Sequence, residues 1–149
     1  MSEKVVLFIC IENACRSLMA EALFNANPPE GWVAISAGTS PAPSPNPRTG
    51  PMLHEIGLEV PPHSPQVLTP EMIDRARVRV TMGCLNDASC PARLKALDLR
   101  DWELPDPTPL DDPGFRKVRD RLVGLVRGLR TELVLSARRE SAISGGVAR

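Results

Sequence analysis

Residues Val5–Ser17 read Val-Val-Leu-Phe-Ile-Cys-Ile-Glu-Asn-Ala-Cys-Arg-Ser. The first five residues are apolar and mostly β-branched or aromatic, which is typical of a buried strand that ends at Cys10. A short loop follows, and Arg16 and Ser17 then open an amphipathic helix. A strand, a loop and a helix in this order form an anion-binding site, because the loop amides and the first helical N–H groups have no intrahelical partner.

The same loop combines an oxyanion binder with a nucleophile. Arg16 adds a full positive charge on a planar guanidinium that matches a tetrahedral oxyanion. We expect this positive field to stabilise a thiolate at Cys10, to which Ser17 can donate a hydrogen bond. A cysteine that ends a strand is more often a small core residue, but the spacing Cys-x5-Arg-Ser between a strand and a helix favours catalysis. The predicted oxyanion-binding residues are Ile11, Glu12, Asn13, Ala14, Cys15 and Arg16.

Strands and helices are expected to alternate along the rest of the chain. Further strands are predicted at 32–36 and 78–82, with a short extended segment at 98–102. Helices are predicted at 16–26, about 46–57, 69–76, 87–97 and 112–132. Alternation of this kind implies right-handed crossovers and a doubly wound α/β fold with a parallel sheet. Ligands of such sheets bind beyond the carboxyl ends of the strands, where Cys10 and Cys84 should meet.

Length and composition limit the classes of function. The 149 residues suit a single domain over 1–135, and 136–149, rich in Ser, Ala, Arg and Gly, are expected to be a flexible tail. With 18 basic and 18 acidic residues, no overall charge recruits nucleic acid or an anionic membrane. Four cysteines without a secretion signal or a transmembrane stretch favour reduced thiols and a cytoplasmic location.

Several motifs resemble those of one known family. Residues 10–17 are similar to the signature loop of low-molecular-weight protein tyrosine phosphatases and of the related thioredoxin-coupled arsenate reductases. Further matches follow in family order at 36–39, at 80–84 and at the Asp106-Pro107 pair. The resemblance covers about residues 4–133 and implies a four-stranded parallel sheet flanked by helices.

The resemblance to the arsenate reductases implies a sequence of thiol reactions. Cys10 attacks arsenate, and Asp106, in a proline-rich loop, acts as the general acid. Cys84 then attacks Cys10 and releases arsenite, and Cys90 attacks Cys84, so that the disulfide moves to Cys84–Cys90. External thioredoxin, or another dithiol or thiol, is the expected reductant, with no bound cofactor or metal. The predicted catalytic residues are Cys10, Arg16, Ser17, Cys84, Cys90 and Asp106.

Two alternative functions remain open. The first is a tyrosine phosphatase that hydrolyses phosphate monoesters, but Asp106-Pro107 is followed by Thr108-Pro109 and the chain contains no tyrosine. Phosphatases of this type usually carry aromatic residues beside the acid, so this departure favours the reductase. The second alternative is a non-enzymatic thiol or metal sensor. The cysteine spacings fit the usual zinc knuckles poorly, and no nearby histidine completes a zinc site.

Several residues near the loop are expected to support it. Asn13 either holds the shape of the loop by side-chain hydrogen bonds to the loop backbone or is an ordinary turn residue, and Ser36 supports the loop from the neighbouring strand. Cys15 is expected to pack rather than react. Glu12 occupies a place where the family often has a small residue, and its carboxylate near the mouth would oppose bulky anions.

Four further polar residues receive structural interpretations. His63, in a proline-rich turn, is interpreted as a solvated loop residue, and His54 as a surface or packing residue of a helix. No third partner completes a Cys–His protease arrangement. Asp111 and Asp112 are alternatives to Asp106, but their position favours capping of the last helix.

Overall fold

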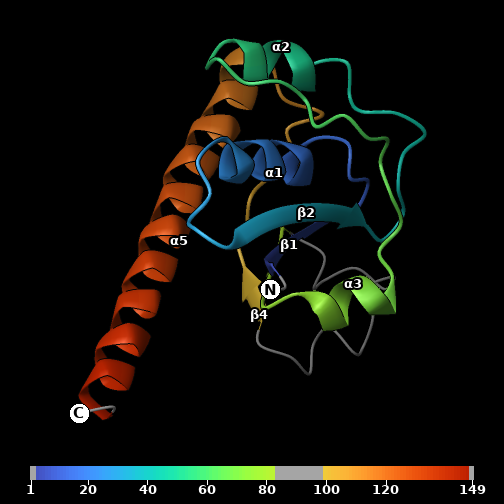
Figure 1. The fold of residues 1–149 in the computed structure, drawn as a ribbon. Helices are drawn as coiled ribbons and strands as arrows, with labels where there is room; N and C mark the ends of the chain where they lie inside the picture. Colours follow the sequence, from blue (N-terminus) through green and yellow to red (C-terminus); the bar gives the residue numbers. More distant parts are fainter. Residues whose placement is uncertain (1–2, 83–98, 148–149) are drawn as a thin grey trace.

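A computed structural model describes residues 3–82 and 99–147, which form a parallel sheet with helices on both faces (Figure 1). The strand order is β2-β1-β3-β4, and every pair is parallel, as predicted. The strands are β1 (Lys4–Cys10), β2 (Trp32–Gly38), β3 (Val78–Thr81) and β4 (Leu99–Asp101).

The central strand β1 is buried on both faces and both edges. Its residues from Val5 to Ile9 are fully inaccessible to solvent, which explains their continuously apolar sequence. The chain leaves β1 for β2 on one side and later returns to β3 on the other. Cys10, paired with Gly38, therefore ends β1 at the switch point of a doubly wound sheet, the usual ligand-binding position.

Alternate residues of β1 point into two different cores. The helices are α1 (Arg16–Ala26), α2 (Thr49–His54), α3 (Pro70–Arg75) and α5 (Asp112–Val147), and Figure 1 shows their arrangement. Phe8 and Cys10 belong to the larger core, which is formed with α1, α2 and α5, whereas Leu7 and Ile9 join the smaller core with α3. In the larger core, the ring centroids of Phe8 and Phe24 lie 6.3 Å apart in an edge-to-face contact.

Helix α5 begins as predicted but is longer than predicted. It starts at Asp112 and buries a stripe that includes Phe115, Leu122 and Leu129. The sequence suggested an end at about 132 and a flexible tail over 136–149, but the helix continues to Val147 and projects beyond the sheet (Figure 1). The helix extends this far because of its local sequence. Residues 137–140 are Ala, Arg, Arg and Glu, which have high helix propensity and so favour a helix even where it makes no contact with the core.

The other predicted elements differ mainly at their ends. Helix α2 is shorter than the predicted 46–57, because a turn precedes it and Gly57, with φ of +78°, follows it. The elements predicted at 69–76 and 98–102 are confirmed as α3 and β4. The helix predicted at 87–97, together with Cys84 and Cys90, lies outside the described residues. No helix in the described ranges combines the length and apolarity needed to cross a bilayer.

Candidate active site

The sulfur of Cys10 has hydrogen-bond partners in the loop that follows it and in the first turn of α1. Cys10 is only 2% exposed, and its Sγ lies 2.8 Å from Ser17 Oγ and 3.2 Å from the Asn13 amide nitrogen, which donates to it. In the contact with Ser17, either atom can be the donor. The geometry therefore agrees with the predicted roles of Cys10 as nucleophile and Ser17 as its hydrogen-bond partner.

A small cavity lies beside Cys10. It has a volume of about 60 Å³, and its lining includes Cys10, Arg16 and Asp106. A water-sized sphere needs roughly 10–15 Å³, so the cavity holds about as many atoms as a tetrahedral oxyanion. Within the described part of the chain, the amides of residues 11, 12, 14 and 15 donate to no protein acceptor. These free donors fit the predicted oxyanion loop.

The N-terminus of α1 is left open toward the cavity. Its N-cap residue, Cys15, provides no side-chain cap, and its first turn contains no acidic residue. A helix start without a capping carboxylate retains its partial positive charge for a bound anion.

Arg16 is fixed beside the sulfur by backbone carbonyls. It is 8% exposed, and its Nη1 donates to Met82 O at 2.8 Å and to Leu104 O at 3.0 Å. Within residues 3–82 and 99–147, its other two guanidinium nitrogens donate to no protein acceptor. Arg16 therefore joins the end of β3 to the loop before Asp106 and still has donors available for an oxyanion.

The acidic loop brings one carboxylate to the cavity. Asp106 is exposed, lines the cavity with Cys10, and accepts the Thr108 amide at 3.0 Å through Oδ1. Of the two alternative acids, Asp111 caps α5 as expected, because it accepts the Gly114 amide at the start of that helix. Asp112 is not a cap and instead pairs with Arg48 at 2.8 Å.

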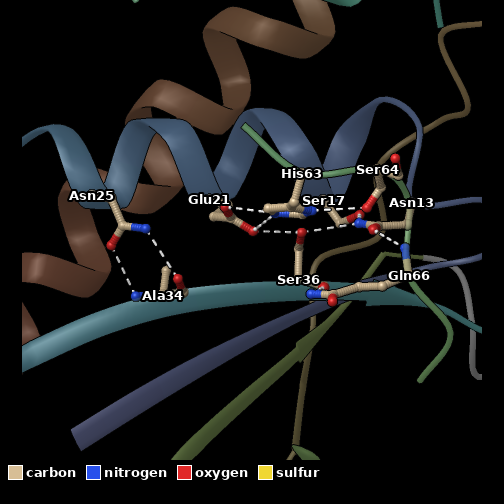
Figure 2. A network of polar contacts seen from close by, with 9 residues as sticks. All are labelled: Asn13, Ser17, Glu21, Asn25, Ala34, Ser36, His63, Ser64 and Gln66. Carbon is tan, nitrogen blue, oxygen red and sulfur yellow. Dashed lines mark hydrogen bonds and ion pairs between the residues drawn. The ribbon is translucent and has the colours of Figure 1, made fainter. Parts of the chain in front are cut away.

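Asn13 holds the loop in an uncommon backbone conformation. Its φ is +51°, which asparagine tolerates better than most residues. Its Nδ2 donates to Ser17 Oγ at 2.7 Å and to Ser36 Oγ at 3.0 Å, and its Oδ1 accepts the Gln66 amide (Figure 2). Ser36 supports the loop from β2, as predicted. Asn13 also holds the loop, but its side chain bonds Ser17, Ser36 and Gln66 and not the backbone of the loop itself, as the sequence had suggested. No sequence pattern pointed to Gln66.

The interpretation of His63 as a solvated residue is wrong. Its Nε2 lies 3.0 Å from both carboxylate oxygens of Glu21, and its Nδ1 lies 2.9 Å from the Ser64 carbonyl (Figure 2). Burial lowers the pKa of His63, but the Ser64 carbonyl and the Glu21 carboxylate outweigh it and raise that pKa above its ordinary value. A charged residue on the buried face of α1, Glu21, was the available sequence signal.

Cys15 packs at the junction of the loop and α1. Burial raises the pKa of its thiol to about 12, although a hydrogen bond with Thr49 opposes the shift. Cys15 therefore remains a protonated thiol near neutral pH, and the prediction that it packs rather than reacts is consistent with its burial.

Gly38 allows the loop to lie close to β2. A Cβ atom at this position would lie 2.5 Å from the Ile11 carbonyl oxygen and 2.9 Å from the Asn13 amide nitrogen. Both neighbours are backbone atoms, so any side chain at residue 38 must displace the loop.

We expect Gly38→Ala to lower kcat/KM for a phosphate ester by at least about tenfold, because displacement of the loop moves its amides away from the bound oxyanion. Steady-state hydrolysis of para-nitrophenyl phosphate measures this change. Gly50→Ala is the matched control, since its added Cβ meets only Val60 Cγ2 at 3.7 Å. Equal activity in the two variants would contradict the close approach as a requirement for the site.

Residues 5–139 match the model of the low molecular weight phosphotyrosine protein phosphatase family. The chain belongs to this family. The match extends over the cavity loop, the sheet and most of α5, so the whole site lies within family sequence. The resemblance inferred from the loop motif is thereby confirmed.

The chain is also similar to individual reductases and phosphatases of known name. Arsenate reductase 1 of Staphylococcus epidermidis is 30% identical over 122 residues, which cover 82% of this chain and 92% of that protein. A thioredoxin-dependent arsenate reductase of Corynebacterium glutamicum is 31% identical, with a TM-score of 0.75 over 91% of this chain but only 64% of that longer chain. An arginine phosphatase from Geobacillus stearothermophilus is 26% identical, with a TM-score of 0.80 over 91% of this chain and 96% of that chain.

The fold thus brings nine of the eleven predicted site residues together and leaves two unplaced. Ser17 and Asn13 contact the Cys10 sulfur. The predicted residues that line the cavity are Cys10, Ile11, Glu12, Ala14, Cys15, Arg16 and Asp106. Cys84 and Cys90 belong to the segment outside the described residues. Among the described residues, no three His, Cys, Asp or Glu side chains converge on a common point where a metal could bind.

Proposed function

We propose that this protein is an arsenate reductase whose nucleophile is Cys10. The observation that carries the proposal is the buried Cys10 side chain, whose sulfur accepts the Asn13 amide and contacts Ser17 Oγ, and which lines a cavity the size of an oxyanion. Arsenate is a tetrahedral oxyanion like phosphate, so the loop amides and Arg16 would hold either one.

The first chemical step forms a covalent adduct. The Cys10 thiolate attacks arsenic, an S–As bond forms and one As–O bond breaks. Asp106, which lines the same cavity, gives its proton to the departing oxygen, which leaves as water. Arg16 and the open start of α1 stabilise the negative charge on the remaining oxygens.

In the second stage, arsenic is reduced and two cysteine sulfurs are oxidised to a disulfide. The Cys84 thiolate attacks the Cys10 sulfur, an S–S bond forms, and the electrons of the S–As bond reduce arsenic from As(V) to As(III), which leaves as arsenite. Cys90 then attacks Cys84 and regenerates the Cys10 thiol. A thioredoxin-like dithiol then reduces the Cys84–Cys90 disulfide and is itself oxidised to a disulfide. The sequence supports this order, because Cys84 follows β3, the neighbour of β1, by three residues.

Two relatives support the choice of arsenate. The Staphylococcus epidermidis protein is an arsenate reductase by name, and the Corynebacterium glutamicum protein is a thioredoxin-dependent one. Thioredoxin is therefore the reductant that we propose for this chain.

Phosphate ester hydrolysis is the second candidate function. The cavity already unites a nucleophile, an oxyanion loop and an acid, which is sufficient for hydrolysis by water without further thiols. Membership of the low molecular weight phosphotyrosine protein phosphatase family also favours this candidate. We expect such hydrolysis as a residual activity of the same loop.

Serine variants of the two distal cysteines separate the candidates. Cys84→Ser and Cys90→Ser should each lose multiple-turnover arsenate reduction coupled to thioredoxin and its reductase, because each lacks a thiol of the relay. Both variants should retain wild-type hydrolysis of para-nitrophenyl phosphate. Sustained arsenate turnover in either variant would reject the relay, and absence of arsenate reduction in the wild type would leave the phosphatase as the function.

A further inference from the structure

We propose that Arg48 is a positioning residue for Asp106, because it holds one end of the loop that carries this carboxylate, residues 104–110. The inference rests on the proposed role of Asp106 as general acid, and Arg48 itself lies outside the cavity lining. Arg48 directly precedes α2, and that helix lies beside the start of α5 (Figure 1). The acid loop, as we call residues 104–110, leads into this start of α5.

Two arginines hold the two ends of the acid loop by its backbone carbonyls. Arg16 Nη1 donates to Leu104 O at 3.0 Å, before the acid. Arg48 Nη1 donates to Leu110 O at 2.8 Å, after the acid. Between these carbonyls the chain forms no helix or strand, and four of its five residues are exposed. The position of Asp106 therefore depends strongly on the two contacts at the ends.

A tight turn connects Leu110 to Asp106. The Leu110 amide donates to Pro107 O at 2.9 Å, and the Thr108 amide donates to Asp106 Oδ1 at 3.0 Å. Pro107 is buried, and its ring and that of Pro109 restrict rotation of the backbone within the turn. A displacement of Leu110 therefore moves the carboxylate that lines the cavity.

The guanidinium of Arg48 has two further contacts that restrict its own movement. Its Nη2 pairs with Asp112 Oδ1 in the first turn of α5 at 2.8 Å. Its Cζ lies 4.6 Å from the centroid of the Phe115 ring, which is fully buried. A planar group that stacks on a fixed ring and donates to both a carboxylate and a carbonyl has little freedom, so Arg48 holds Leu110 O in one place.

The turn that contains Arg48 is also bonded to the oxyanion loop. Ala14 O accepts the Asn46 amide at 3.0 Å and the Thr49 hydroxyl at 2.8 Å. The Arg48 amide donates to Asn46 Oδ1 at 2.9 Å within the turn. The segment 46–49 therefore contacts both the loop that binds the oxyanion and the loop that supplies the proton, and it fixes their separation.

The position of Asp106 matters most for a leaving group that needs a proton. In ester hydrolysis the Cys10 thiolate forms an S–P bond, the P–O ester bond breaks, and the departing oxygen takes the proton of Asp106. An ester of para-nitrophenol releases a stable anion and needs little protonation. An ester of phenol releases a more basic anion and needs the acid. A displaced Asp106 should therefore slow the hydrolysis of phenyl phosphate selectively.

Arg48→Met is the variant that tests the inference, because methionine keeps an apolar chain against Phe115 but cannot donate to the acid loop. Arg116→Met is the matched control. Arg116 also joins α5 to the end of α2, but its hydrogen bonds within the described residues all go to Glu55. The readouts are kcat/KM for para-nitrophenyl phosphate and for phenyl phosphate, the inhibition constant of inorganic phosphate, and the thermal midpoint.

We expect Arg48→Met to lower kcat/KM for phenyl phosphate by about tenfold more than kcat/KM for para-nitrophenyl phosphate, which is part of the contribution of a general acid. Arg48→Lys, a milder variant, should show a smaller selective loss of the same sign. The inhibition constant of phosphate should stay close to that of the wild type, because both hydrogen bonds to Ala14 O are retained. Arg116→Met should keep the wild-type ratio of the two kcat/KM values.

A double variant separates positioning from other effects. Adding Arg48→Met to Asp106→Asn should cause no further selective loss for phenyl phosphate, because the acid that Arg48 positions is already absent. A further selective loss would mean that Arg48 acts by another route and would overturn the inference.

Two other results would also overturn the inference. One is a ratio of the two kcat/KM values that is the same in Arg48→Met, Arg48→Lys and Arg116→Met, which would assign Arg48 to stability alone. The other is a wild type that hydrolyses neither ester, which would refute the acid together with its positioning. A wild type that hydrolyses both esters but does not reduce arsenate would reject the proposed reductase, and a selective loss in Arg48→Met would still support the inference.

Discussion

Replacement of Cys10 by serine is expected to lower both arsenate reduction and phosphate ester hydrolysis by at least about 10³-fold. The thiolate forms the covalent bond in either reaction, and a serine hydroxyl at the same place has no general base to activate it. Single-turnover arsenate reduction and steady-state ester hydrolysis measure the two losses separately.

Cys15→Ser is the matched control for this substitution. Cys15 lines the same cavity, but its raised pKa keeps it a protonated thiol. We therefore expect ester hydrolysis by Cys15→Ser to remain within about tenfold of wild type. If Cys15→Ser were inactive and Cys10→Ser active, the assignment of the nucleophile would be wrong.

The second large effect is expected at Arg16. Arg16→Lys keeps a positive charge, but a single ammonium group cannot bond both backbone carbonyls and also present a planar pair of donors to an oxyanion. Loss of an oxyanion donor typically costs about 10²–10³-fold in kcat, and we expect a loss of that size in kcat/KM.

Arg79→Lys provides a control with nearly the same local structure. Arg79 is also 8% exposed, and its guanidinium also donates to two backbone carbonyls, those of Ile73 and Ala76. It lies outside the cavity lining, so its replacement should lower the thermal midpoint and change kcat/KM by less than about threefold. Equal losses of kcat/KM in the two variants would mean that Arg16 acts only through stability.

The central part of the site could be predicted from sequence because it is local. Cys10, Asn13, Arg16 and Ser17 lie within eight consecutive residues, and the order of strand, loop and helix determines their geometry. The parallel sheet follows equally directly from the alternation of elements along the chain, and the start of α5 from a regular apolar stripe.

The rest of the site depends on contacts that no local pattern encodes. His63 reaches Glu21 from a loop 42 positions later in the chain, and Gly38 is required because a different loop lies against it. The extension of α5 was missed because apolar periodicity ends where the core ends, whereas helix propensity does not. The thiol relay, the reductant and the cytoplasmic location remain predictions.

The disulfide formed after one turnover tests the central claim most directly. Cys90→Ser should be mixed with one equivalent of arsenate, quenched with acid and analysed by peptide mass spectrometry. The account predicts a Cys10–Cys84 disulfide formed in proportion to the arsenite released, because Cys90 is absent and cannot resolve it. Release of arsenite with Cys10 and Cys84 still present as free thiols would contradict the account.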